Sequence, residues 1–291
     1  MTSLKNIKES AVVRTFLSAS KSSKILFTLG LAIDTMLIIL VLFGPLIAPY
    51  DPLQMTANTF SPPTSQNLMG TDSLGRDLFS RLVVGTRYSL GVSLIAVGVS
   101  IVIGVLLGSV SGYFGGPIDR VLTIIMDSLY IFPGFIFVLI IAVVLGPGIW
   151  QTAMAMSFGW IPGNFRLIRS LTMSVKERGF IEAERIIGAS DWHIIRYHIA
   201  PYFLSVLFVT ISLGMARGTL AVSGLGFLGL GIPPPTPEWG TELAQGRQFL
   251  LRGAWWLVIC PGFFVMLAML GFNLLSEGLD EIFNPSVKRL K

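Results

Sequence analysis

Charged residues are scarce in this chain, and their scarcity limits the classes of protein to which it can belong. Asp, Glu, Lys and Arg make up 13% of the 291 residues, whereas hydrophobic residues make up 53% and the mean hydropathy is +0.74. Soluble domains carry about 25% charged residues. A soluble protein with a large core is therefore a poor interpretation. Recurring apolar stretches of about 20 residues indicate a membrane protein with several spans.

Several kinds of chemical site are also missing. The single cysteine, Cys260, excludes an intrachain disulfide and a cysteine metal cluster, and its apolar surroundings indicate a packing role. The chain has no G-x-x-x-x-G-K-[ST] phosphate-binding motif, no Ser-His-Asp grouping in a plausible setting and no paired catalytic carboxylates. We therefore expect no catalytic residue, metal or cofactor in the chain itself. In a membrane protein the net charge of +5 reports orientation first, so no nucleic-acid partner is expected.

Six apolar stretches predict an all-α, polytopic membrane protein with six transmembrane helices. The expected spans are residues 25–48, 89–113, 121–145, 149–173, 202–225 and 254–275. Pro133, Pro162 and Pro261 fall within spans, where membrane helices tolerate kinks. The polar, basic start of the chain shows no convincing cleavage site, so we expect the first span to be retained.

Lys and Arg are distributed unevenly about these spans. With the N-terminus inside, fifteen lie in cytoplasmic segments and five in external ones, which is a positive-inside bias. The sequence therefore predicts a multi-pass protein of the cell membrane with both termini cytoplasmic. The expected segments are a cytoplasmic tail 1–24, a first span 25–48, an external segment 49–88 with an interfacial helix, a five-helix core 89–278 with a cytoplasmic loop 174–201 and an external loop 226–253, and a cytoplasmic tail 279–291.

The stretch "EAERIIGASDWHIIRYHIAP" at residues 182–201 interrupts the apolar sequence. It predicts two short amphipathic helices, the first with Phe180, Ala183 and Ile187 on one face. Gly188 suits the turn between them, because glycine tolerates a left-handed backbone.

The second helix is expected to begin at a capping Ser190 or Asp191. An apolar stripe follows at Trp192, Ile195 and Ile199. The bilayer surface, the protein's own helix ends or a partner protein could each cover such faces. His193 and His198 are five residues apart and off one face, so local hydrogen bonding is favoured over a metal site.

The spacing of Glu182, Ala183, Gly188 and Pro201 resembles the loop signature of the permeases of ABC importers. Glu184 and Ala200 depart from the usual pattern, where alanine and leucine stand. In that family this loop docks on the ATPase subunit, so the resemblance implies a coupling role for these residues together with Ala189 and Ser190.

Further segments resemble the C-type permease of the dipeptide, oligopeptide and nickel importers. They include "GTDSLGRDLFSRLVVGTRYSL" at 70–90, "GGPIDRVLTIIMDSLYIFPG" at 115–134 and "LGFLGLGIPPPTPEWG" at 225–240. The last predicts a shaped external loop, either a rigid lid or a guide for ligand, with Phe227, Gly229, Pro234 and Trp239 as candidate residues. In it Gly226 replaces a family serine, and upstream Val222 replaces a family glutamate.

Residues 70–88 also predict a helix at the outer interface. Thr71 or Asp72 suits its N-cap, and Leu74, Leu78 and Leu82 form one stripe. The charged residues between them are expected off this stripe.

Three ionisable residues fall within spans: Asp34, Asp127 and Arg217. Such residues are costly in a membrane and usually face protein or a water cavity. Arg217 either faces the translocation path, contacting ligand or Asp34, or makes a static polar contact. For Asp127, nearer the cytoplasmic end, a helix-end contact is sufficient.

The resemblance implies a type I ABC importer permease that moves di- and oligopeptides by alternating access. Its implied partners are a homologous B-type permease, two ATPase subunits that carry ATP and Mg, an extracytoplasmic solute-binding protein and the lipid bilayer. Nickel chelates, glutathione or oligosaccharides remain alternative solutes. A stand-alone secondary transporter or channel is the alternative from another class, although no repeat of the two halves is evident.

Overall fold

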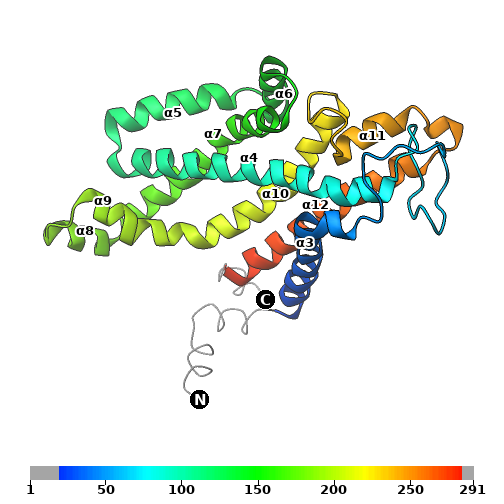
Figure 1. Ribbon diagram of the computed structural model, residues 1–291. Helices are drawn as coiled ribbons and strands as arrows, with labels where there is room; N and C mark the ends of the chain where they lie inside the picture. Colours follow the sequence, from blue (N-terminus) through cyan, green and yellow to red (C-terminus); the bar gives the residue numbers. More distant parts are fainter. Residues whose placement is uncertain (1–19, 284–291) are drawn as a thin grey trace.

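The computed structural model describes residues 20–283, which fold into helices and connecting segments without a β-sheet (Figure 1). The all-α prediction is confirmed. In chain order the elements are α3 (Lys21–Ile47), α4 (Leu78–Phe114), α5 (Gly116–Tyr130), α6 (Gly134–Leu145), α7 (Ile149–Lys176), α8 (Gly179–Ile186), α9 (Asp191–His193), the π-helical η1 (Ile194–Ile199), the 3₁₀ turn η2 (Ala200–Tyr202), α10 (Phe203–Phe227), α11 (Trp239–Arg247), the 3₁₀ turn η3 (Leu250–Arg252) and α12 (Trp256–Phe283).

The helices form an elongated bundle with two distinct ends. α4 runs along its length with α7 beside it, and α12 packs against both α3 and α10. The loop that carries α8 and α9 projects at one end, whereas α11 and the segment 49–77 lie at the other (Figure 1). The cytoplasmic loop 174–201 and the external loop 226–253 expected from the sequence are therefore at opposite ends of the molecule.

Length and composition bear out a polytopic membrane protein but not the full count of six spans. Four helical stretches within residues 20–283 are long and apolar enough to cross a membrane: Lys21–Ile47, Leu78–Phe114, Asp191–Phe227 and Trp256–Ile282. The bent pair α5 and α6 raises the count to five. α7 has 28 residues but is less apolar, because Gln151, Asn164, Arg166 and Arg169 lie along it.

The third predicted span, 121–145, is broken rather than kinked. α5 ends at Tyr130, α6 begins at Gly134, and the two helices meet at an angle of 87°. Pro133 lacks an amide hydrogen and disfavours helical backbone at the residue before it, which explains the break. Pro162 and Pro261, by contrast, lie inside continuous helices.

The predicted interfacial helix over 70–88 begins later than expected and is not a separate element. Asp77 is the N-cap, accepting a 2.8 Å hydrogen bond from the Ser80 amide, and the helix continues unbroken to Phe114. Gly70 and Gly75 have φ of +74° and +72°. This left-handed conformation prevents the helix from starting before Gly75. At 37 residues α4 is about 55 Å long, longer than the bilayer core of about 30 Å.

The two ends of the described residues, 20–283, lie close together. Ser23 in the first turn of α3 donates a hydrogen bond to Glu281 in the last turn of α12. α12 continues as one helix to Phe283, past residue 279, where the C-terminal tail was predicted to begin. Most of the predicted tail 1–24 and residues 284–291 lie outside the described residues.

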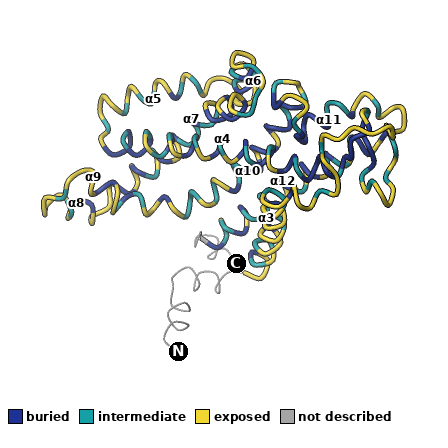
Figure 2. The backbone as a smooth tube through the Cα atoms, viewed as in Figure 1, coloured by how far each residue is buried: buried dark blue, intermediate teal, exposed yellow. Residues whose placement is uncertain are grey.

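Close helix contact depends on small residues, as expected for membrane bundles. Gly104 and Gly108 of α4 sit so near Asn164 and Phe165 of α7 that an added methyl group would clash with them. Gly91 and Gly98 of the same helix face open space, so they make no such close contact. Exposed residues predominate on α5, on α6 and on the outer face of α3 (Figure 2).

Candidate functional site

The loop between α7 and α10 contains the predicted pair of short helices. α8 ends before Gly188, whose φ of +88° provides the expected left-handed turn. Ser190 caps the second helix: its Oγ accepts a 3.3 Å hydrogen bond from the His193 amide. From Asp191 the chain remains helical, through a π-helical turn, into α10.

The loop packs onto the bundle through one side only. Ile181, Ile194 and Ile199 are fully buried against a cluster that includes Val175 of α7 and Phe203 of α10. The buried face of α8 therefore contains Ile181 and not the predicted Phe180, Ala183 and Ile187. A helix this short packs through whichever residue faces the neighbouring helix ends.

The second predicted stripe is correct at Ile195 and Ile199 but wrong at Trp192, which is 64% exposed. Ile186 and Ile187 are 80% and 76% exposed. These three apolar side chains form what we call the outer face of the loop. Of the alternatives considered from the sequence, the protein's own helix ends cover the inner face, and no described residue covers the outer face.

The residues predicted to couple to an ATPase are mostly accessible, although Ala189 packs against the inner cluster. Glu182, Ala183, Gly188, Ser190 and Pro201 are exposed, and Ala189 is half-buried.

The histidines make local contacts, as the sequence favoured. His198 Nε2 lies 3.4 Å from a carboxylate oxygen of Glu184, and the His193 ring lies 4.8 Å from the ring of Tyr197.

Polar contacts fix the loop to α4 and join α5 to α7 nearby. The Tyr113 hydroxyl at the end of α4 donates a 2.7 Å hydrogen bond to Asp191. Near it, Asp119 of α5 forms a two-point ion pair with Arg169 of α7, at 2.5 and 2.7 Å. The ends of α4, α5 and α7 are therefore joined where the loop begins.

A buried ionic cluster holds the opposite end together. Arg81 of α4 is fully buried, and its guanidinium lies 2.6 Å from Glu242 of α11. It also donates a 2.8 Å hydrogen bond to the Pro52 carbonyl, and Arg76 pairs with Asp72 at 2.5 Å. The sequence predicted these charges on an interfacial surface, which is wrong: they join three segments that are distant in the chain.

Glu238 is a second buried anchor at this end. It accepts hydrogen bonds from Ser89 Oγ at 3.0 Å and from the Gly240 and Thr241 amides at 2.9 and 2.8 Å. Complete burial raises the pKa of Glu238 above its usual range, while these hydrogen bonds act in the opposite direction. Gly226 lies against this carboxylate, where a side chain would clash, which explains glycine at that position.

The predicted external-loop residues are close in sequence but differ in their surroundings. Trp239 is fully buried, and its Nε1 donates a 3.0 Å hydrogen bond to the Leu82 carbonyl. The Phe227 ring lies 4.8 Å from the Arg247 guanidinium, Gly229 has φ of +77°, and Pro234 is exposed. The helix α11 was not predicted, because the proline-rich stretch before it suggested an entirely extended loop.

The three intramembrane charges lie in separate places. Asp34 is buried between α3 and Gly271 of α12, and its carboxylate has no hydrogen-bond partner among the described residues. Asp127 pairs with Arg166 at 2.6 Å, a half-exposed contact. Arg217 is exposed on α10 and makes no ion pair with Asp34, so that suggested contact is absent.

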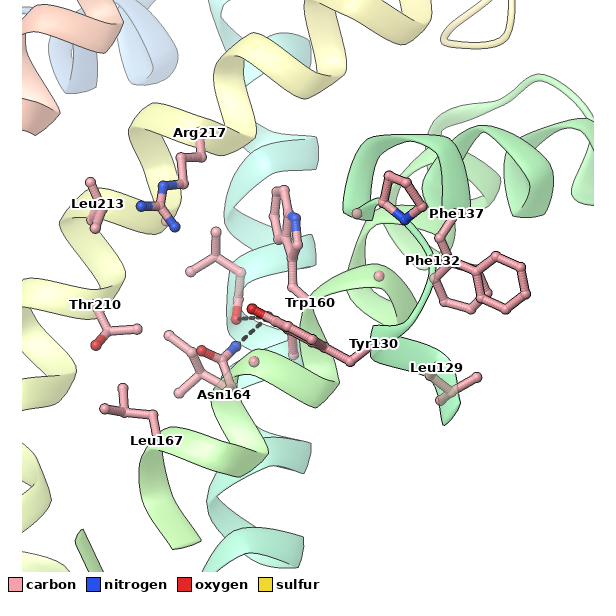
Figure 3. Close-up of a pocket in the computed structure, with 18 of the residues that line it drawn as sticks. Leu129, Tyr130, Phe132, Phe137, Trp160, Asn164, Leu167, Thr210, Leu213 and Arg217 are labelled. Carbon is pink, nitrogen blue, oxygen red and sulfur yellow. Dashed lines mark hydrogen bonds between the residues drawn. The ribbon is translucent and has the colours of Figure 1, made fainter. Parts of the chain in front are cut away.

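Arg217 lines a cavity of about 730 Å³ between α4, α7, α10 and the break between α5 and α6. Figure 3 shows it on the same helix as Thr210 and Leu213, with Trp160 and Tyr130 across the space. Its walls contain aromatic, aliphatic and a few polar side chains. Such a cavity suits a small organic ligand better than a metal ion.

The chain belongs to the family of inner membrane components of binding-protein-dependent transport systems. The family pattern matches residues 104–289. It is 37% identical over 260 residues to the dipeptide transport system permease DppC of Alkalihalophilus pseudofirmus, covering 89% of this chain and 85% of that protein. The di/tripeptide transport system permease DppC of Pseudomonas aeruginosa is 35% identical, with coverage of 89% and 88%. The resemblance found from the loop motif is confirmed.

The fold matches a solved ABC importer. A chain of the inward-facing MetNI methionine ABC transporter superposes with a TM-score of 0.52, covering 68% of this chain and 95% of that one. The two chains are 18% identical, so this likeness defines the fold alone. The protein is accordingly a multi-pass membrane protein with the permease fold of a type I ABC importer.

Proposed function

We propose that this chain is the C-type membrane subunit of an ATP-driven importer of di- and oligopeptides. The observation that carries the proposal is the loop with its outer face: anchored on one side, it leaves Ile186, Ile187 and Trp192 uncovered. Large apolar side chains in an otherwise polar loop mark an interaction surface. The names of the relatives support a peptide as the solute.

The proposed assembly contains three further kinds of protein partner. A homologous B-type permease completes the translocation path, and two ATPase subunits bind ATP and Mg and contact the outer face. A solute-binding protein delivers the peptide to the end formed by α11. In this orientation the loop and both termini are cytoplasmic.

The mechanism follows from how the loop is attached. Closure of the ATPases on ATP pushes on the outer face, and the buried inner face passes this displacement to α4, α7 and α10. The path then opens to the binding protein while its cytoplasmic side closes. The chain supplies mechanical connection and a path for the solute, and ATP hydrolysis occurs on the partner subunits.

Cross-linking tests the contact directly. Cysteine at Ala183, in a Cys260→Ser background that removes the one native thiol, is expected to cross-link to a co-purifying ATPase. Cysteine at Leu251, 99% exposed at the opposite end, is the matched control and should give no such product. Absence of any ATPase on purification, together with uptake that survives ATP depletion, would contradict the proposal.

The solute is tested through the partner that selects it. The binding protein encoded beside this chain is purified, and its affinity for di- and tripeptides is compared with that for nickel chelates, glutathione and oligosaccharides. Preferential binding of peptides supports the proposed solute. Preferential binding of any of the others would identify that compound as the solute instead of a peptide, and the proposed transport mechanism would be unaffected.

A further inference from the structure

The cavity beside Arg217 contains backbone that does not belong to a helix. Ile131 and Phe132 lie in the break between α5 and α6 and line the cavity, with Pro133 beside them. Non-helical backbone at membrane depth is tolerated only where it is buried in protein or lines a water-filled space. Broken helices of this kind supply solute sites in other transporters. The break therefore indicates a hydrated cavity.

Arg217 places a positive charge in this cavity. It is the fifteenth of the 25 residues of α10, near the middle of the helix. A charge at such depth is costly unless it is paired or faces water. None of the ion pairs formed within residues 20–283 involves Arg217, and its side chain is exposed. The guanidinium is therefore available to a ligand.

The other lining residues do not offset this charge. Ser100, Asn164 and Thr210 are neutral, and Tyr130 and Trp160 are aromatic. None of the other residues lining the cavity is ionisable apart from the weakly acidic phenol of Tyr130.

The nearest acidic side chain in this region of α5 is itself neutralised. Asp127 lies in an adjoining surface pocket and is paired with Arg166 at 2.6 Å. The cavity therefore has a net positive potential, with apolar and aromatic walls.

We propose that this cavity is a solute-binding site in which Arg217 binds a free carboxylate and the aromatic walls contact the apolar body of the solute. The inference rests on the proposed function and deepens it by naming the ligand class: small organic solutes that end in a carboxylate, such as the C-terminus of a short peptide. A guanidinium matches a carboxylate with two parallel hydrogen bonds. At about 730 Å³ the cavity is within the range of small-molecule sites, roughly 300–1,000 Å³.

Cysteine labelling tests the charge of the cavity without requiring transport. Thr210, two helical turns from Arg217 and also in the lining, is replaced by cysteine in a Cys260→Ser background of the assembled transporter. The rate of modification by the anionic sulfonatoethyl methanethiosulfonate is divided by the rate for the cationic trimethylammonium-ethyl reagent. Arg217→Gln should lower this ratio about three- to tenfold, whereas Arg217→Lys should preserve it.

A matched variant controls for the general effect of removing an arginine. Arg87 is exposed on α4 and lies outside the lining, so Arg87→Gln should leave the ratio unchanged. An unreactive cysteine at Thr210, or a ratio that does not respond to Arg217→Gln, would overturn the proposal.

Protection by ligand tests the chemical class. Trialanine at millimolar concentration should slow labelling of the cysteine at Thr210, whereas trialanine amide, which lacks the carboxylate, should not. Arg217→Gln should weaken the protection by trialanine about tenfold or more, the usual effect of losing a charged hydrogen bond. Equal protection by both compounds, or none by either, would exclude a carboxylate site.

Uptake separates this proposal from the function on which it rests. In proteoliposomes with ATPases and binding protein, Arg217→Gln should lower trialanine uptake about tenfold with basal ATP hydrolysis retained. Unchanged uptake would contradict the site. If the wild-type complex moves no peptide, the proposed function fails, and the labelling ratio and protection still decide whether the cavity binds carboxylates.

Discussion

The hydroxyl of Tyr113 donates a 2.7 Å hydrogen bond to the carboxylate of Asp191. Tyr113 lies in the last turn of α4, and Asp191 is the first residue of α9. The longest helix of the molecule is thereby attached to the loop proposed to meet the ATPase. The side chains of Lys176 and Arg185 also approach the face of the Tyr113 ring, at 5.7 and 5.3 Å.

Removing the Tyr113 hydroxyl should weaken the transmission of motion from the loop to α4 more than it lowers the stability of the fold. Tyr113→Phe keeps the ring and deletes one hydrogen bond to a charged group, which costs about 1.5–3 kcal/mol at most. Asp191 is exposed and regains water, so the loss of stability should be near the lower end. We expect fewer solute molecules imported per ATP hydrolysed, measured in proteoliposomes.

The matched control for this variant is Tyr197→Phe. Tyr197 lies in the same loop and is 60% exposed, and its hydroxyl forms no hydrogen bond with the described residues. It should leave the import ratio unchanged. An equal effect of both substitutions would show that the Tyr113 bond has no particular role.

Gly188 is required by backbone geometry rather than by space. Its φ is +88°, and an added side chain would meet no atom within 4 Å. Gly188→Val should therefore insert and assemble, but the strained turn, at about 1–3 kcal/mol, should shift α8 relative to α9 and uncouple ATP hydrolysis from uptake.

Gly179→Ala provides the comparison for Gly188. Gly179 is also in open space but has no left-handed φ, so alanine there should preserve coupling. The measurement is the ratio of uptake to ATP hydrolysis. Intact coupling in Gly188→Val would remove the turn from the mechanism.

The outer face of the loop should tolerate charge in the isolated chain but not in the complex. Ile186 is 80% exposed, so Ile186→Asp should change the thermal midpoint of the chain little. It should abolish co-purification of the ATPase, because an unpaired carboxylate would be buried in the contact. Leu251→Asp, at an even more exposed position at the far end, should retain the ATPase. Loss in both variants would point to general misassembly.

The ion pair between Arg81 and Glu242 should be strongly stabilising only while both partners are present. Arg81→Leu leaves Glu242 buried without its cation, and we expect a loss of about 3–5 kcal/mol in the free energy of unfolding. Thermal unfolding in detergent measures it. Arg87→Gln, at an exposed position of the same helix, should have little effect.

The double variant separates the ion pair from simple packing. Arg81→Leu combined with Glu242→Leu removes the unpaired charge and should recover at least about half of the loss. No recovery would indicate that the hydrogen bond from Arg81 to the Pro52 carbonyl, and not the ion pair, is the main contribution.

Patterns that depend on neighbouring residues were predictable from the sequence. The spans represented by α3, α10 and α12, the turn at Gly188 and the cap at Ser190 follow from apolar length and local backbone preference. The coupling motif was recognised because its spacing lies within a single loop. The residues alone did not decide what covers the apolar faces of that loop. The structure shows that the protein's own helix ends cover the inner face.

Features that depend on distant residues were not predictable. Arg81 and Glu242 are 161 residues apart, and nothing local to either indicates that they pair in the interior. The amphipathic reading of residues 70–88 failed for the same reason, because it assumed water or lipid where α11 lies. Pro133 indicated a disturbance of the helix, but the 87° angle between α5 and α6, which both contact α7, is not encoded in the neighbouring residues.

The continuity of α4 has a mechanical consequence. One helix of about 55 Å carries Arg81 near one end and Tyr113 at the other, with no proline or break between them. A tilt of about one degree at the Tyr113 end would displace the Arg81 end by about 1 Å, because a rigid rod converts rotation into translation in proportion to its length. A movement on one side of the membrane would then displace residues on the other side directly, without a series of side-chain rearrangements between them.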